Sequence, residues 1–213
     1  MDKTAIVVGG TGLIGKALVD KLANADHISK VITLTRGPAE HFSPKVHNQV
    51  IQFNHMEDYA PLFKGDLLFS CLGTTRKQAG SIVAQRMVDL EYQYTAAKLA
   101  LNNGVCHYLL VSSSGANSHS NNAYLQMKGE LEDRVQELSF DHISIFQPSL
   151  LLGKREDFRI GEKLGSWILP VLCALPGLRR FRPIQGEKVA EKMIRVSQNP
   201  GPSLERFSLD KIF

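Results

Sequence analysis

Residues 5–15 have the sequence AIVVGGTGLIG, in which an apolar run passes directly into a glycine-rich turn. A continuous apolar run is typical of a strand that is buried on both faces of a parallel sheet. After the turn, apolar residues recur at the spacing of a helix that packs one face against a core. These residues are Leu13, Ile14, Ala17, Leu18 and Leu22. The segment therefore predicts a strand, a tight turn and a helix in that order.

The glycines of this turn have the spacing of a dinucleotide-binding loop. In such loops one glycine allows the tight bend, one lets the pyrophosphate approach the backbone, and one lets the helix pack close to the strand. Gly9, Gly12 and Gly15 stand at these positions. The helix that follows offers free N–H groups and the positive end of its dipole to the phosphates. We therefore expect a bound dinucleotide at this turn.

A second phosphate-binding pattern overlaps the first. Gly10 and Gly15-Lys16 have the spacing of a P-loop, which ends in a serine or threonine that binds Mg²⁺. Ala17 occupies that last position and has no oxygen to offer a metal ion. The pattern thus favours a dinucleotide over a nucleoside triphosphate.

The rest of the chain alternates short apolar runs with helical patterns, as in α/β proteins with a parallel sheet covered on both faces. The further expected strands are 31–34, 48–53, 67–72, 107–112 and 142–147, and the expected helices include 81–102, 123–138 and 186–198. Residues 149–183 interrupt this rhythm with several Gly and Pro residues, and they are too few for an independent core. The sequence predicts one doubly wound parallel-sheet domain over 1–213, with 149–183 as a small C-terminal substrate lid.

The composition argues against several classes of protein. Among 213 residues, 25 Lys and Arg stand against 21 Asp and Glu, and a net charge of +4 does not indicate a nucleic-acid binder. Cys71, Cys106 and Cys173 are widely spaced, so we expect no disulfide framework and a reducing compartment, the cytoplasm. The seven histidines show no metal-binding spacing, so no metal site is expected. The longest apolar stretch, 164–178, is interrupted by prolines, and we expect neither a targeting segment nor an integral membrane segment.

Arg36 bears on the choice of dinucleotide. Proteins that bind NAD place an acidic residue about 20 residues beyond the glycines, where it holds the ribose 2′-hydroxyl. Arg36 follows the second expected strand at that distance, and a guanidinium favours a 2′-phosphate through charge-assisted hydrogen bonds. The sequence therefore predicts NADPH rather than NADH. Leu72 and Gly73 lie at the end of the fourth expected strand, at the sheet edge where we expect the adenosine to lie.

A second group of residues has the chemistry of proton transfer. Tyr124 and Lys128 are four residues apart on an expected helix, so they share one face, and the ammonium favours the tyrosinate electrostatically. The same lysine can reach the ribose hydroxyls of a nicotinamide nucleotide. The fifth strand ends in serines that could hold a substrate carbonyl near the phenol; we favour Ser113, with Ser114 as the alternative.

Together these features resemble the short-chain dehydrogenase/reductase superfamily in its atypical, extended-like form. Within it, four segments resemble the HIV Tat-interacting-protein family, and the likeness covers roughly residues 4–165. The segments are CLGTTR (71–76), SSSGANS (112–118), YLQMKGELE (124–132) and KREDFRIGE (154–162). The resemblance implies a Rossmann fold with bound NADPH and Tyr124 as proton donor. Ser114 departs from the family, one member of which carries a lysine there.

The resemblance also implies which residues contact the cofactor, in addition to Gly9 and Gly15 of the turn. They are Thr11, Gly12, Leu13, Ile14, Arg36, Gly37, Leu72, Gly73, Tyr124, Lys128, Leu151 and Arg159. Some members of the family are described through protein–protein contacts, so a homodimer or another protein partner stays open beside a small-molecule substrate.

Two functions of different classes fit these features. The first is an NADPH-dependent oxidoreductase that reduces a small carbonyl or enone-type substrate, with Tyr124, Lys128 and Ser113 as catalytic residues. The second is an NADPH-binding sensor that acts through protein partners with little or no turnover. An epimerase or dehydratase with tightly held NAD⁺ is disfavoured by Arg36. The basic cluster Arg179, Arg180 and Arg182 is by default a solvated basic face, with an acidic substrate group, a phospholipid surface or a protein partner as alternatives. The sequence leaves the substrate and the oligomeric state open.

Overall fold

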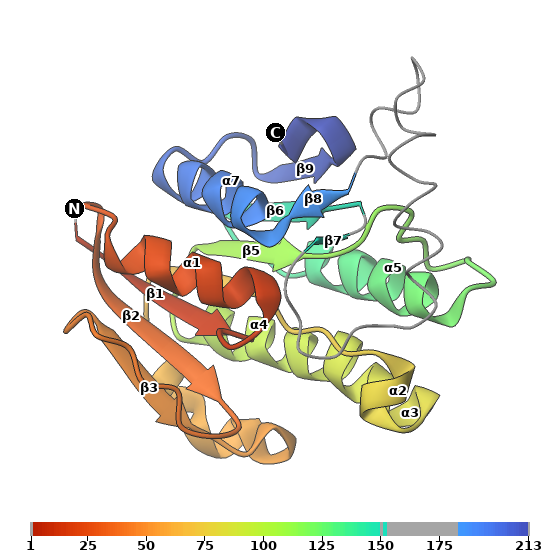
Figure 1. Ribbon diagram of the computed structural model, residues 1–213, viewed down its shortest axis with the longest axis horizontal. Helices are drawn as coiled ribbons and strands as arrows, with labels where there is room; N and C mark the ends of the chain where they lie inside the picture. The colour runs from red at the N-terminus through yellow and green to blue at the C-terminus, as the bar shows by residue number, and fades with distance from the viewer. Residues whose placement is uncertain (1, 150, 153–182, 213) are drawn as a thin grey trace.

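The computed structural model describes residues 2–149, 151–152 and 183–212, which fold around one parallel sheet (Figure 1). Seven strands lie in the order β3-β2-β1-β4-β5-β6-β9, and every neighbouring pair is parallel. The strands are β1 (Lys3–Val8), β2 (Ile28–Thr35), β3 (Val46–Val50), β4 (Leu67–Ser70), β5 (His107–Val111), β6 (His142–Gln147) and β9 (Leu204–Ser208). Two short strands, β7 (Leu151–Leu152) and β8 (Ile184–Gln185), pair separately. The predicted doubly wound α/β fold is confirmed.

Helices cover both faces of the sheet (Figure 1). On one face, α1 (Leu13–Ala23) and α7 (Gly186–Gln198) pack against each other and against alternate apolar residues of the central strands. On the other face lie η1 (Phe53–Phe63), α4 (Tyr92–Asn102) and α5 (Ala123–Gln136). The remaining helices are α2 (Arg76–Ala79), α3 (Ile82–Arg86), the π turn η2 (Met87–Glu91) and η4 (Leu209–Ile212). Each apolar run of the central strands is thus buried on both sides, as its composition requires.

The order of the strands reverses between β1 and β4, the point at which open α/β sheets have their ligand-binding crevice. From β1 the chain moves outward through β2 and β3, and it then returns to the other side of β1 and moves outward again from β4. Val8 pairs with Ser70, so β1 and β4 end side by side. In open α/β sheets, ligands bind beyond the carboxyl ends of the strands at such a reversal. The glycine turn that follows Val8 lies at this place.

Three expected elements differ from those observed. The third strand ends at Val50 instead of residue 53, because Phe53 begins η1. The single helix expected over 81–102 is divided into α3, η2 and α4 by the π turn. The strand β9 was not expected, because its sequence LERFS lacks an apolar run. It lies at the edge of the sheet and is partly exposed. Most of the expected lid, 149–183, lies outside the described residues.

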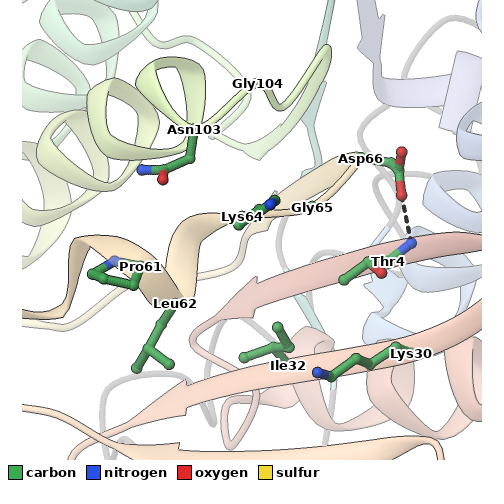
Figure 2. A pocket seen from close by; sticks show the side chains of 10 residues that line it. All are labelled: Thr4, Lys30, Ile32, Pro61, Leu62, Lys64, Gly65, Asp66, Asn103 and Gly104. Atoms are coloured by element: carbon green, nitrogen blue, oxygen red, sulfur yellow. Dashed lines mark hydrogen bonds between the residues drawn. The ribbon is translucent and has the colours of Figure 1, made fainter.

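A hollow of about 620 Å³ opens at the opposite edge of the sheet, at the amino-terminal ends of β1, β4 and β5 (Figure 2). Lys30 and Ile32 of β2 lie on one side of it and Asn103-Gly104 on the other. The Asp66 carboxylate, which also lines it, accepts a hydrogen bond from the Thr4 backbone N–H at 2.7 Å. This hollow is therefore remote from the glycine turn and does not contain the predicted site.

A pair of histidines, of which His107 is buried and His142 half-buried, lies at the same edge of the sheet. His107, the first residue of β5, is 2% exposed, and its Nε2 lies 2.9 Å from Ser144 Oγ. Its ring packs edge-on against that of His142, with the ring centroids 5.6 Å apart. Burial lowers the pKa of His107 to about 4, and the neighbouring His142 and Lys3 act in the same direction. The folded protein thus keeps this imidazole neutral.

We expect the free energy of unfolding to decrease as the pH falls from 6.5 toward 4. In this window the unfolded chain protonates His107 near its ordinary pKa of 6.5, whereas the folded protein does not, so the unfolded state binds more protons. The loss reaches about 3 kcal/mol at the lower end of the window, and above pH 6.5 the contribution is fully present. Urea denaturation between pH 7 and pH 4.5 should show a shallower pH dependence for His107→Leu than for the parent protein.

The matched control is His47→Leu, which replaces an exposed histidine of β3. His27, whose pKa is also lowered, is present in all three proteins and contributes equally to each. An unchanged pH dependence in His107→Leu would show that His107 is not the group that titrates.

Candidate functional site

The glycine turn is built by two close backbone contacts. Gly9 has φ +82°, and a Cβ at this position would lie within 2.6 Å of the Cys71 carbonyl oxygen and the Leu72 nitrogen. A Cβ at Gly15 would overlap the Gly9 carbonyl oxygen and come within 2.8 Å of its carbonyl carbon. The first contact holds the turn against the chain that leaves β4, and the second holds α1 against the turn. Both positions therefore require glycine, for the reasons of bending and close packing expected from the sequence.

The N-terminus of α1 is free to bind an anion. Gly12 is its N-cap and has no side chain to cap the first N–H groups, while the Gly12 N–H itself donates to the Gly9 carbonyl at 3.1 Å. Thr11 is exposed, Leu13 is half-buried, and the Ile14 side chain is buried in the core. Because Ile14 points inward, any contact that it makes with a ligand must come from its backbone. A dinucleotide pyrophosphate fits this cradle, which a Cβ at Gly9 or Gly15 would fill.

Arg36 lies where the sequence places it, directly after Thr35 ends β2. Its side chain is exposed and makes no hydrogen bond or ion pair with another described residue. The guanidinium is thus free to meet an anion at the carboxyl edge of the sheet. Leu72 and Gly73 follow β4 at the same edge, next to the glycine turn.

The thiol of Cys71 lies between these segments. Burial raises the pKa of Cys71 to about 12, and the positive charge of Lys128 only partly offsets this effect. The thiol is therefore protonated at neutral pH and is not a nucleophile.

Tyr124 and Lys128 lie one turn apart on α5. The Asn122 side chain caps this helix by accepting hydrogen bonds from the backbone N–H groups of Tyr124 and Leu125 at 3.0 and 3.2 Å. The Tyr124 side chain is half-buried, whereas the Lys128 side chain is only 3% exposed. Gly129 comes next, and a Cβ there would overlap Ser118 N and come within 2.6 Å of Asn117 Cα. The loop after β5 therefore packs directly on α5 beside Lys128.

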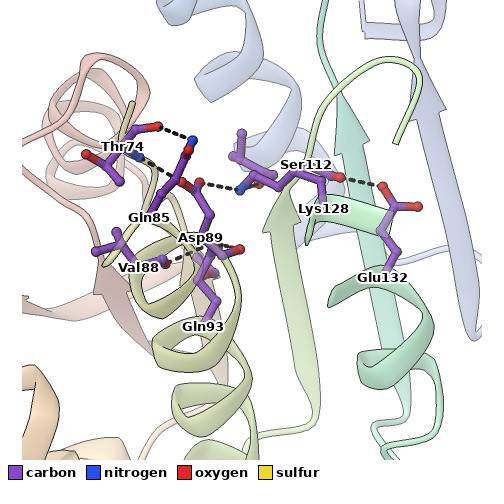
Figure 3. Close-up of polar contacts among 10 residues, drawn as sticks. Thr74, Gln85, Val88, Asp89, Gln93, Ser112, Lys128 and Glu132 are labelled. Carbon is purple, nitrogen blue, oxygen red and sulfur yellow. Dashed lines mark hydrogen bonds and ion pairs between the residues drawn. The ribbon is translucent and has the colours of Figure 1, made fainter. Parts of the chain in front are cut away.

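The buried ammonium of Lys128 is held from two sides (Figure 3). Lys128 Nζ lies 3.4 Å from Asp89 Oδ1 and 3.5 Å from the Val111 carbonyl oxygen at the end of β5. Asp89 is fully buried, and its other oxygen accepts the Thr74 backbone N–H at 3.3 Å. A charge pair at such depth requires both members, because either one alone would be left buried and uncompensated.

Asp89 is a site residue that the sequence reasoning missed. It lies in the π turn, and Gln93 Nε2 donates to the Asp89 carbonyl at 2.9 Å (Figure 3). Ser70 Oγ donates to Gln93 Oε1 at 2.9 Å, so the Gln93 side chain connects this turn to β4. The sequence does contain one indication of its role. Asp89, Gln93 and Ala97 are spaced four residues apart, so on a helix they share one face, and all three are buried. An acidic residue at a buried position indicates a partner of opposite charge.

The serines after β5 have different roles. Ser112 is buried, and its hydroxyl donates to the carboxylate of Glu132 (Figure 3). The same carboxylate also accepts Gln147 Nε2 at 2.9 and 3.0 Å. Ser113 and Ser114 are partly exposed at the loop that follows. Because Ser112 is committed to Glu132, Ser113 stays the predicted catalytic serine and Ser114 the alternative. Glu132, one turn beyond Lys128, is a second residue that the sequence reasoning missed.

Two predicted contact residues come after β6, and the structure describes only the first of them. Leu151 belongs to β7, pairs with Ile184 of β8 and packs against the core on the α1 side. Arg159 lies outside the described residues, as does the basic cluster Arg179, Arg180 and Arg182. Their predicted roles stay predictions.

The sequence matches the model of an NAD(P)H-binding family over residues 9–167. The chain belongs to this NAD(P)H-binding family. Protein HTATIP2 of Rattus norvegicus is 40% identical over 167 residues, which cover 76% of this chain and 69% of that protein. Protein FMP52, mitochondrial, of Candida albicans is 31% identical over 205 residues, or 92% of this chain and 88% of that one. The resemblance to the Tat-interacting-protein family is thereby confirmed.

Several solved structures share the fold of this NAD(P)H-binding protein. MoeE5 in complex with UDP-glucuronic acid and NAD has a TM-score of 0.73 at 14% identity, with 97% of this chain and 76% of that chain covered. DesIV, a dTDP-glucose 4,6-dehydratase from Streptomyces venezuelae with NAD and DAU bound, has a TM-score of 0.71 at 15% identity, with 96% and 74% covered. At this identity the likeness shows the fold alone.

Two further findings concern partners and location. Within the described ranges, no helix is long and apolar enough to cross a membrane, and no three or more His, Cys, Asp or Glu side chains gather as a metal site. The name of the Candida albicans relative places that protein in mitochondria. The cytoplasmic location expected for this chain stays a prediction, as does a homodimer or protein partner.

Proposed function

We propose that this protein is an NADPH-dependent oxidoreductase of the short-chain dehydrogenase/reductase type that reduces a small carbonyl or enone-type substrate. The observation that carries the proposal is the buried Lys128, held by Asp89 and the Val111 carbonyl one helical turn from Tyr124. A buried ammonium at the carboxyl edge of a dinucleotide-binding sheet has a chemical use there, because it stabilises negative charge that develops on a nearby phenol.

Each residue has a distinct task in this proposal. Bound NADPH supplies the hydride. Tyr124 Oη donates a proton to the substrate oxygen as negative charge develops there, and Ser113 orients that oxygen by a hydrogen bond. Lys128 has three N–H donors, of which Asp89 and Val111 occupy at most two, so one is left for a ribose hydroxyl. Arg36, exposed at the end of β2, binds the 2′-phosphate.

A titration of the purified protein with NADPH and NADH, followed by fluorescence, tests the proposal. A panel of carbonyl compounds and quinones is then added to the NADPH complex. Oxidation of NADPH by a member of the panel supports a reductase. Tight NADPH binding without oxidation by any member favours the sensor function, in which the nucleotide state is passed to a protein partner.

Arg36→Asp should invert the nucleotide preference. We expect the Kd of NADPH to rise at least about tenfold, because a charge-assisted hydrogen bond is lost and a repulsive carboxylate takes its place. The Kd of NADH should change little or fall, since the introduced carboxylate can hold the ribose 2′-hydroxyl. The matched control is Lys30→Asp, the same charge change at an exposed position near the other end of β2. An unchanged ratio of the two dissociation constants in Arg36→Asp would remove this assignment.

A further inference from the structure

A polar cluster joins β2 to β3 beneath the turn that carries Arg36. Asn48 of β3 lies opposite Thr33 of β2 in the register of the sheet. Its Nδ2 donates to Thr35 Oγ1 at 2.7 Å and to Thr33 Oγ1 at 2.9 Å, and its Oδ1 accepts the Ala39 backbone N–H at 3.0 Å. Thr35 Oγ1 in turn donates to the Gly37 carbonyl oxygen at 2.8 Å.

The chemistry of these groups allows only one arrangement. The hydroxyl proton of Thr35 is used by the Gly37 carbonyl, so its oxygen can only accept, and the NH₂ group of Asn48 must face it. The Ala39 N–H needs an acceptor, which the amide oxygen of Asn48 supplies. An aspartate at 48 would place an oxygen against the Thr35 oxygen, and an apolar residue would satisfy neither side. Both threonines are nearly fully buried, so unpaired groups here would be costly.

The cluster fixes the backbone on both sides of the exposed arginine. Thr35 holds the carbonyl of Gly37, directly after Arg36, and Asn48 holds the N–H of Ala39. Among the described residues the Arg36 side chain has no partner, and the backbone of this turn sets the position from which the guanidinium extends. The cluster also lies close to the glycine turn, since a Cβ added at Gly10 would come within 3.6 Å of the Thr33 methyl group.

We propose that Thr35 and Asn48 are positioning residues that set the preference for a 2′-phosphorylated nucleotide by fixing the turn at Arg36–Ala39. This inference rests on the proposed NADPH function. A turn fixed before binding lowers the entropic cost of the contact between Arg36 and the phosphate. Neither residue needs to touch the nucleotide, and NADH, which lacks the 2′-phosphate, gains nothing from the fixed turn.

The test compares dissociation constants of NADPH and NADH for Thr35→Val and Asn48→Ala. Thr35→Val keeps the shape and β-branching of the side chain, so the strand should accept it, and it removes only the hydroxyl. We expect the Kd of NADPH to rise roughly threefold to tenfold in each variant, while that of NADH stays within about twofold. Thr35→Ser, which restores the hydroxyl, should recover most of the preference. Gln49→Ala, at the next position of β3 on its exposed side, should behave as the parent protein.

The outcomes separate this inference from the function on which it rests. If the unaltered protein binds NADPH and NADH equally, the proposed NADPH preference fails and the inference fails with it. If the unaltered protein prefers NADPH and both variants keep the same ratio of the Kd of NADH to the Kd of NADPH, only the inference fails. Equal weakening of both nucleotides would show a general structural role and would also overturn it. A weaker preference for NADPH over NADH in both variants, recovered in Thr35→Ser, supports the inference.

Discussion

Gly15→Ala should raise the dissociation constants of both NADPH and NADH on the order of 100-fold or more. A methyl group at this position would overlap the Gly9 carbonyl oxygen. Gly9 cannot retreat, because it already lies against the backbone of Cys71 and Leu72. The turn must therefore rearrange, and the free N–H groups of α1 lose the geometry that receives a pyrophosphate. Titration by fluorescence or calorimetry measures the loss.

The matched control for this variant lies in the same turn. A Cβ at Gly10 would approach no atom of its neighbours closer than 3.4 Å, where it meets the Val19 side chain. Gly10→Ala should consequently bind both nucleotides nearly as well as the parent protein. If Gly15→Ala binds with unchanged affinity, the pyrophosphate does not lie at this turn, and the whole assignment of the site is wrong.

Tyr124→Phe should reduce turnover by about two orders of magnitude or more, the usual effect of removing a general acid. The phenyl ring keeps the packing of the half-buried side chain, so the Kd of NADPH should change little. Steady-state rates with whichever carbonyl compound the panel identifies, measured beside NADPH binding, separate these two effects.

The control is Tyr94→Phe on α4. The ring of Tyr94 packs near Lys98 and Arg134, away from the crevice, so this variant should keep full turnover. Turnover equal to that of the parent protein in Tyr124→Phe would mean that another group, or water, donates the proton.

The glycine turn and its consequences could be predicted from the sequence because they depend on local chemistry. Strand, turn and helix lie within residues 3–23, and the requirement for glycine at 9 and 15 follows from backbone contacts that the local spacing already implies. The parallel sheet could be predicted in the same way, because short apolar runs alternate with helical patterns along the chain. The match to an NAD(P)H-binding family confirms this part of the prediction.

The partners of the predicted residues could not be found in this way, because they depend on contacts between distant segments. Lys128 was identified by its spacing from Tyr124, but its ion pair with Asp89 joins two residues that are 39 positions apart in the sequence. Ser112 and Glu132 meet only once α5 packs beside β5. The choice among neighbouring serines depends on where β5 ends, and a pattern of apolar residues does not fix a strand end to one residue.

The π turn at Met87–Glu91 has a consequence for how this protein tolerates change. A π turn holds one residue more than the α-helix it interrupts, and such turns cost helical stability. Removing one residue here would restore regular hydrogen bonding but rotate everything before it by about 100° relative to α4. Gln85, which donates to the Thr74 carbonyl at 3.4 Å, would swing away from the chain that leaves β4. The π turn thus costs helical stability but keeps Gln85 directed at the chain that leaves β4. Selection for thermostability alone would therefore favour loss of the π turn.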